Sequence, residues 1–91
     1  MKLRIARRAA RELEQTRTFL EGENPAAASR IFRRIDQILL TLLEYPTMGR
    51  RGRLPETREM AVPGTPMLLV YRVSGDILQL VAVLHGRQDY P

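Results

Sequence analysis

The chain has 91 residues, no cysteine and a formal net charge of +5, with 15 Lys and Arg against 10 Asp and Glu. This length accommodates one domain with a single core, and the lack of cysteine excludes a disulfide framework and a thiolate zinc site. The apolar run Met67–Tyr71 is far shorter than the ~20 residues that span a bilayer, and arginines interrupt the N-terminal apolar residues, unlike a secretory signal. We expect a cytoplasmic protein with one domain over residues 1–91, no membrane contact, no metal and no cofactor.

Arginine carries nearly all of the positive charge, since Lys2 is the only lysine. Guanidinium groups pair with carboxylates and phosphates through a planar fork, so the excess favours a nucleic acid or an acidic protein as partner. Basic residues form two clusters, one of Lys2 and four arginines over residues 2–11 and one of four arginines over residues 50–58. Solvated faces without any partner would produce the same clusters, so composition leaves these interpretations open.

The first half of the chain predicts one strand and two helices. Residues 2–5 alternate polar and apolar side chains, as a short strand does. The apolar spacing then changes to three and four, which predicts a helix that Gly22 ends. Asn24 and Pro25 suit the N-cap and first position of a second helix, which Pro46 ends. The apolar stripe of this second helix is wide, which indicates burial against the sheet and the first helix, with a strip left for a partner.

Three further strands are predicted in the second half, after a loop that contains Arg and Gly. They cover residues 57–62, 67–73 and 77–84, and the last two are nearly all apolar, as central strands are. The order of elements is then β-α-α-β-β-β. We expect an α+β fold in which a helix hairpin packs on one face of a small, mainly antiparallel, four-stranded sheet.

Ser74-Gly75-Asp76 signals a tight hairpin between the last two strands. A two-residue turn there places even positions of one strand on the same face as odd positions of the next. Arg72 is therefore predicted to share a face with Gln79 and His85. That face also includes Leu68, Val70, Val81 and Val83. The opposite face has no ionised side chain and should carry the helices. Its residues are Met67, Leu69, Tyr71, Val73, Leu78, Leu80, Ala82 and Leu84.

Six short motifs follow one another along the chain. They are A-x-x-E-L-x-x-T-x-x-F-L at 9–20, N-P-A-A-A at 24–28, Y-P-x-x-G-R at 45–50, R-E-x-x-V-P-G at 58–64, L-V-Y-R-V at 69–73 and V-L-H-G-R-x-D at 83–89. In this order they resemble the RelE/ParE superfamily of bacterial type II toxins, and the last motif is most similar to the ParE branch. The resemblance extends over essentially the whole chain.

The resemblance implies a toxin that a cognate antitoxin holds inactive in a hetero-oligomeric complex. An acidic antitoxin segment would cover part of the arginine-rich and apolar surface. The residues predicted to contact it are Arg7, Arg11, Phe32, Leu39 and Leu43. Among family members, ParE-like toxins inhibit DNA gyrase by binding, whereas RelE-like toxins cleave messenger RNA on the ribosome. A chain that has lost its toxicity and only binds antitoxin is a third possibility.

The residues favour binding over RNA cleavage. RelE-like enzymes resemble one another in using lysines from the second strand and an arginine from the third, and this chain lacks both. If it were an RNase, His85, Arg87 and Tyr90 would be its candidate catalytic residues, with His85 serving as base or acid. A structural role for His85 at its strand end is equally compatible. We therefore expect a gyrase-binding toxin without an assigned catalytic residue, with target contacts from Arg58, Arg72, His85 and Arg87.

Overall fold

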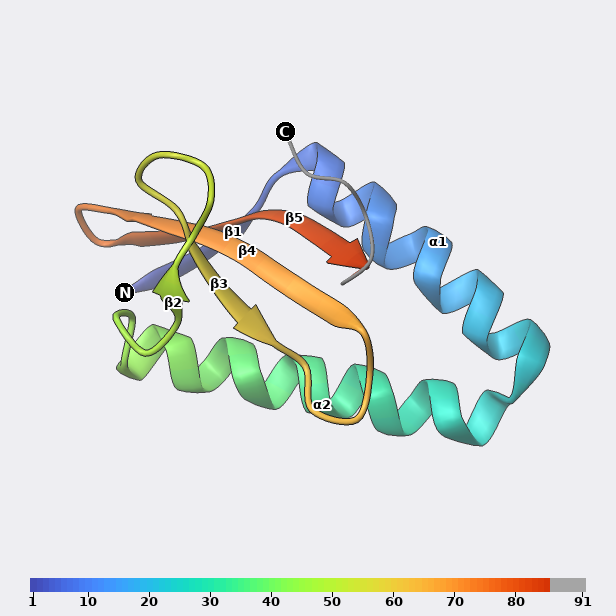
Figure 1. Ribbon diagram of the computed structural model, residues 1–91. Coiled ribbons are helices and arrows are strands. Elements are labelled where there is room, and N and C mark those ends of the chain that lie inside the picture. Colours follow the sequence, from blue (N-terminus) through green and yellow to red (C-terminus); the bar gives the residue numbers. More distant parts are fainter. Residues whose placement is uncertain (86–91) are drawn as a thin grey trace.

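The computed structural model describes residues 1–85 and consists of two helices and one mixed sheet (Figure 1). In chain order the elements are β1 (Lys2–Ile5), α1 (Arg7–Glu23), α2 (Pro25–Glu44), β2 (Arg50–Arg51), β3 (Arg58–Ala61), β4 (Met67–Ser74) and β5 (Ile77–His85). The strand order is β1-β5-β4-β3-β2, and β1 is parallel to β5 while all other neighbours are antiparallel. The predicted α+β class and helix hairpin are confirmed. The sheet has one strand more than predicted, because a two-residue strand such as β2 leaves no alternation to detect.

The helices begin and end for local reasons. The side chain of Asn24 accepts a hydrogen bond from the N–H of Ala27 at 3.1 Å, and Pro25 is the first residue of α2, as predicted. Gly22 does not end α1: it lies in the last turn, and the N–H of Asn24 still bonds to the carbonyl of Leu20. Neither helix is long and apolar enough to cross a membrane, within the part of the chain that the structure describes.

The main core lies between the helices and one face of the sheet. Its buried residues are Ala9, Phe32, Ile35, Leu39, Val62, Met67, Leu69, Leu80 and Val83. Phe32 and Leu39 are only 6% and 5% exposed. These two side chains therefore belong to the core of this chain, which corrects their prediction as antitoxin contacts, whereas Leu40 of the same helix is 67% exposed.

The pairing of β4 with β5 contains one irregularity. Tyr71 lies opposite Leu80 and Val70 lies opposite Ala82, which leaves Val81 as an extra residue in β5. Such a bulge reverses the alternation of side chains beyond it. Neither the turn sequence nor the apolar pattern signals this bulge, so the predicted faces of β5 are correct up to Val81 and wrong from Ala82 onward.

Beyond the bulge the side chains of β5 change layers. Val83 belongs to the main core under the helices, whereas Leu84 belongs to a separate apolar cluster on the other face. The common face predicted for Arg72 and His85 is therefore wrong. His85 lies opposite Met67, which is itself part of the helix-facing core.

Candidate functional site

A buried carboxylate organises the loop between β2 and β3. The side chain of Glu59 accepts hydrogen bonds from Arg50 Nη2 at 3.1 Å, from Arg53 Nε at 3.3 Å and from the Arg53 backbone N–H at 3.1 Å. Burial raises the pKa of Glu59, but the hydrogen bonds from Arg53 and Arg50 together outweigh it and lower the pKa below its ordinary value. Glu59 is therefore ionised at neutral pH and anchors a loop that arches over the sheet on the side away from α2 (Figure 1).

The turn that follows α2 is held by Tyr71 and Arg58. The buried hydroxyl of Tyr71 donates to the carbonyl of Pro46 at 2.7 Å and accepts the N–H of Gly49 at 2.9 Å. Arg58 donates to the carbonyls of Gly49 at 2.8 Å and Thr47 at 3.3 Å. Burial raises the pKa of Tyr71, and the Gly49 N–H and the charge of Arg58 offset this only in part. The hydroxyl therefore remains protonated and keeps its donor role.

These two anchored segments enclose an arginine-rich groove at the hairpin end of β4. It consists of two neighbouring hollows of about 330 Å³ and about 670 Å³, which share Glu56, Arg72 and Val73. We call it the arginine groove. Its cationic residues are Arg4, Arg51, Arg53, Arg58 and Arg72, and its apolar residues are Pro46, Leu54, Pro55, Val73 and Ile77.

Most of these arginines keep an uncompensated charge. Within residues 1–85, no salt bridge forms to Arg4, Arg51, Arg58 or Arg72. Glu56 is the one carboxylate that lines the groove among the described residues. The groove is therefore positively charged and suited to an anionic ligand.

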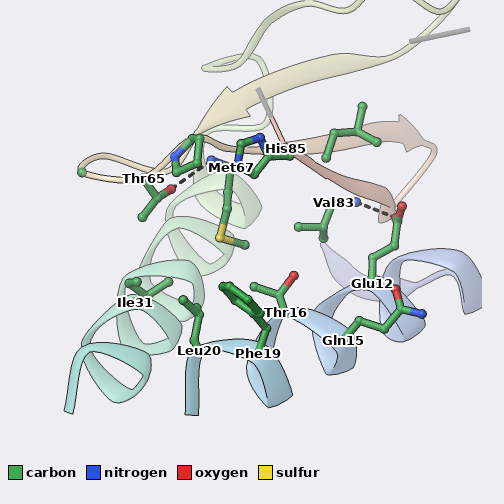
Figure 2. Close-up of a pocket in the computed structure, with 13 residues that line it drawn as sticks. Glu12, Gln15, Thr16, Phe19, Leu20, Ile31, Thr65, Met67, Val83 and His85 are labelled. Atoms are coloured by element: carbon green, nitrogen blue, oxygen red, sulfur yellow. Dashed lines mark hydrogen bonds between the residues drawn. The ribbon is translucent and has the colours of Figure 1, made fainter. Parts of the chain in front are cut away.

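A separate pocket lies at the opposite end of β4, between the two helices and the sheet (Figure 2). This apolar pocket has a volume of about 500 Å³. Phe19 and Leu20 of α1, Ile31 of α2 and Met67 of β4 line it, together with His85 at the end of β5. Phe19 is 66% exposed, so the pocket is open to solvent on the α1 side.

The residues that were predicted to form one target-binding surface are divided between the arginine groove and the apolar pocket. Arg58 and Arg72 line the arginine groove, whereas His85 lines the apolar pocket. Met67, which lies opposite His85, is five residues from Arg72 on β4, or about 16 Å along the strand at ~3.3 Å per residue. His85 and Arg72 therefore do not contact the same small group of a ligand.

The remaining predicted site residues are dispersed. Arg7 and Arg11 are exposed on α1, and Leu43 is half-buried against a small apolar cluster. Arg87 and Tyr90 lie outside the described residues. Within residues 1–85, no three His, Asp or Glu side chains lie close enough together to hold a metal ion.

The comparisons with known proteins place the chain in a family. A family model described as "ParE toxin of type II toxin-antitoxin system, parDE" matches residues 3–90. This chain belongs to the ParE toxin family. The chain is 36% identical over 90 residues to "Putative toxin Y4kP" of Sinorhizobium fredii (strain NBRC 101917 / NGR234), a match that covers 99% of this chain and 93% of that protein. Its fold is similar to that of a solved structure described as "Chromosomal ParDE TA system from P. aeruginosa", with a TM-score of 0.81, 22% identity, and coverage of 93% of this chain and 95% of that one.

As a member of the ParE family, the chain is the toxin of a type II toxin–antitoxin system, and an antitoxin partner follows from this membership. Three of the motifs on which the resemblance depends meet at the arginine groove. Pro46 and Gly49 of Y-P-x-x-G-R are hydrogen-bonded to the hydroxyl of Tyr71 of L-V-Y-R-V. The carbonyl of Gly49 also accepts a hydrogen bond from Arg58 of R-E-x-x-V-P-G. These motif residues thus form the framework of the groove.

Proposed function

We propose that this ParE-family toxin inhibits DNA gyrase by binding to it, without cutting RNA, and that a cognate antitoxin neutralises it in the cytoplasm. The separation of His85 from the arginine groove carries this proposal. Cleavage of RNA by its own 2′-hydroxyl needs proton-transfer groups beside the cations that hold the phosphate. The groove has the cations, but the imidazole lies at the other end of β4.

The other ionisable groups near the groove are engaged in its framework. Glu59 is held in ion pairs with two arginines, and the hydroxyl of Tyr71 is bonded to two backbone groups. Among the described residues that line the groove, Glu56 is then the single carboxylate available for proton transfer, whereas the reaction needs both a base and an acid. This composition supports recognition of a macromolecule over catalysis.

We assign gyrase contact to the arginine groove, through Arg58 and Arg72, and keep His85 and Arg87 as secondary contacts. The exposed arginines of α1, Arg7 and Arg11, are assigned to the antitoxin. The two assignments differ in their consequences, because a substitution in the groove should weaken the effect on gyrase while leaving the capture of antitoxin by α1 unchanged.

The decisive experiment compares the two targets side by side. Purified toxin is added to a gyrase supercoiling assay and to ribosomes that translate a defined message, with cleavage mapped by primer extension. We expect supercoiling to be inhibited at micromolar toxin, with no cuts within codons. The inhibition should be weakened only slightly by His85→Ala and strongly by Arg72→Gln.

Two controls sharpen this comparison. Arg30→Gln removes an exposed arginine of α2 that lies outside the groove, and it should inhibit gyrase as the unaltered toxin does. Unchanged supercoiling together with codon-specific cuts that His85→Ala abolishes would replace this proposal with an RNase of the RelE type.

A further inference from the structure

We propose that the free toxin forms a two-fold symmetric dimer in which Phe19 of each copy enters the apolar pocket of the other. The occupant of the pocket is therefore a second copy of this chain. The inference goes beyond the proposed function and does not rest on it. Three features of the described residues support it: an exposed aromatic ring, an apolar pocket beside that ring, and opposite charges on the two sides of the pocket.

The ring and the pocket lie next to each other on one surface. Phe19 lines the pocket of about 500 Å³ but is 66% exposed, so its ring does not fill it. Among residues 1–85, Phe19 is the one large exposed apolar side chain that lines this pocket. Ile31 of α2 and Met67 of β4 line it as well (Figure 2). Both the ring and these side chains would lose contact with water if a second apolar surface covered them.

A surface that carries a projection beside a hollow can be complementary to itself. In a two-fold symmetric contact the same patch serves both copies, so each contact occurs twice. An axis along the gap between α1 and α2 places α1 of one copy over α2 of the other. Phe19 of each copy then meets Ile31 and Met67 of the second copy, and both pockets are filled together.

The charges around the pocket match this arrangement. Glu23 follows Phe19 by four residues, so both lie on the same side of α1. On the α2 side, Arg34 follows the lining residue Ile31 by three residues. A Cβ on Gly64, another lining residue, would lie 2.8 Å from Arg34 Nη1, so the guanidinium borders the pocket.

Neither of these charges is compensated within one copy. Within the part of the chain that the structure describes, no salt bridge forms to Glu23 or to Arg34. When α1 of one copy lies over α2 of the other, each Glu23 faces an Arg34, which gives two ion pairs across the contact. Such pairs fix the orientation of two partners more than they raise the affinity.

The dimer leaves the arginine groove open. The groove and the apolar pocket share no lining residue and lie at opposite ends of β4, so the cations assigned to gyrase stay exposed in both copies. The formal charge of +5 on each chain opposes association. We therefore expect a weak dimer, with a Kd on the order of 10 µM.

Sedimentation velocity of the purified full-length toxin, from about 1 µM to about 200 µM, measures the association. We expect the sedimentation coefficient to rise with concentration from that of the monomer to that of the dimer. Phe19→Ser should weaken dimerisation more than about tenfold. Leu40→Ser is the matched control, because Leu40 is 67% exposed and lies outside the pocket, and it should have no effect. Circular dichroism verifies that each variant is folded.

Reversal of the charges tests the orientation of the two copies. Glu23→Arg should weaken the dimer about three- to tenfold, because it places two cations opposite each other. The double variant Glu23→Arg/Arg34→Glu should restore the original affinity. Glu21→Arg makes the same change of net charge on another side of α1, since Glu21 is two residues from Phe19, and it should have a smaller effect than Glu23→Arg.

Three results would overturn the proposal. A toxin that stays monomeric over the whole concentration range forms no such dimer. A dimer that Phe19→Ser leaves intact is held by another surface. A double charge variant that is no tighter than Glu23→Arg contradicts the placement of α1 over α2. The assay contains neither gyrase nor antitoxin, so its outcome is separate from that of the supercoiling experiment.

Discussion

The side chain of Glu12 accepts the backbone N–H of Val83 at 2.9 Å and thereby joins α1 to the last part of β5. β1 pairs with β5 only as far as Leu80, and beyond this residue β5 has no neighbouring strand on that side. Val83 is 6% exposed, so its N–H would otherwise lack both a strand partner and water. A carboxylate from a helix thus completes the hydrogen bonding of the sheet (Figure 2).

Removal of this acceptor should destabilise the fold. We expect Glu12→Ala to lower the free energy of unfolding by about 1–3 kcal/mol, the usual cost of a buried donor without a partner, and to accelerate hydrogen exchange of the Val83 amide. Urea denaturation and NMR-detected exchange measure these effects. Glu14→Ala, at an exposed position of the same helix, should change stability by less than about 0.5 kcal/mol. Equal losses in the two variants would contradict the assigned role.

The hydroxyl of Tyr71 should matter more than that of Tyr45. Tyr71→Phe leaves the carbonyl of Pro46 and the N–H of Gly49 without a partner, so we expect a loss of about 2–3 kcal/mol in thermal or urea unfolding. Tyr45→Phe is the matched control, because Tyr45 is 59% exposed and its hydroxyl makes no hydrogen bond within residues 1–85. A neutral Tyr71→Phe variant would show that water replaces the hydroxyl.

The acid stability of the protein should depend on Glu59. Its pKa in the folded state lies below the ordinary value of 4.5, so the ionised carboxylate contributes stability above pH 4.5. This contribution is lost as the pH falls through the lower folded pKa. We expect Glu59→Gln to lose about 1–3 kcal/mol at pH 7, and the difference from the unaltered chain should shrink below pH 4.5. Denaturation curves over this pH range test this, with exposed Glu23→Gln as the control; a difference independent of pH would refute it.

Two glycines with positive φ allow backbone and contact effects to be separated. Gly75 has φ 59° and no atom within 4 Å of the position that a Cβ would take, whereas a Cβ on Gly64, at φ 78°, would lie 2.8 Å from Arg34 Nη1. Gly75→Ala should cost about 1 kcal/mol from the left-handed backbone alone. Gly64→Ala should cost about 1 kcal/mol more, because it displaces Arg34 from the carbonyl of Pro63. Similar losses in chemical denaturation would indicate that Arg34 moves aside freely.

The fold class, the helix hairpin and the order of the long strands could be predicted because they depend on local patterns. Asn24-Pro25 marks the start of α2, and apolar spacing marks both helices. The family could be predicted because its motifs are local as well. The predicted four-stranded sheet was incomplete because β2 has only 2 residues, too few to show alternation. Arg50 of β2 pairs with Glu59 in both backbone and side chain, which no local pattern signals.

The candidate site was less predictable, since it depends on which way side chains point. One extra residue, Val81, moved His85 to the helix side and away from Arg72. Burial of Phe32 and Leu39 could not be separated from partner binding by hydropathy, because both uses require an apolar stripe. Glu59 was assigned no role, although it anchors the loop that shapes the groove. Its burial follows from a loop that folds back over the sheet, and the hydrophobic periodicity of the sequence does not predict the path of a loop.

The bulge at Val81 also constrains how ParE-family toxins can be recombined. β5 consists of two short segments with opposite phase, and the junction between them lies inside the strand. A chimaera spliced at residue 82 with a relative that lacks the extra residue would exchange the two buried apolar clusters that Val83 and Leu84 enter. Crossover points for domain shuffling therefore belong in the hairpin before Ile77, where the whole strand is transferred with its own phase.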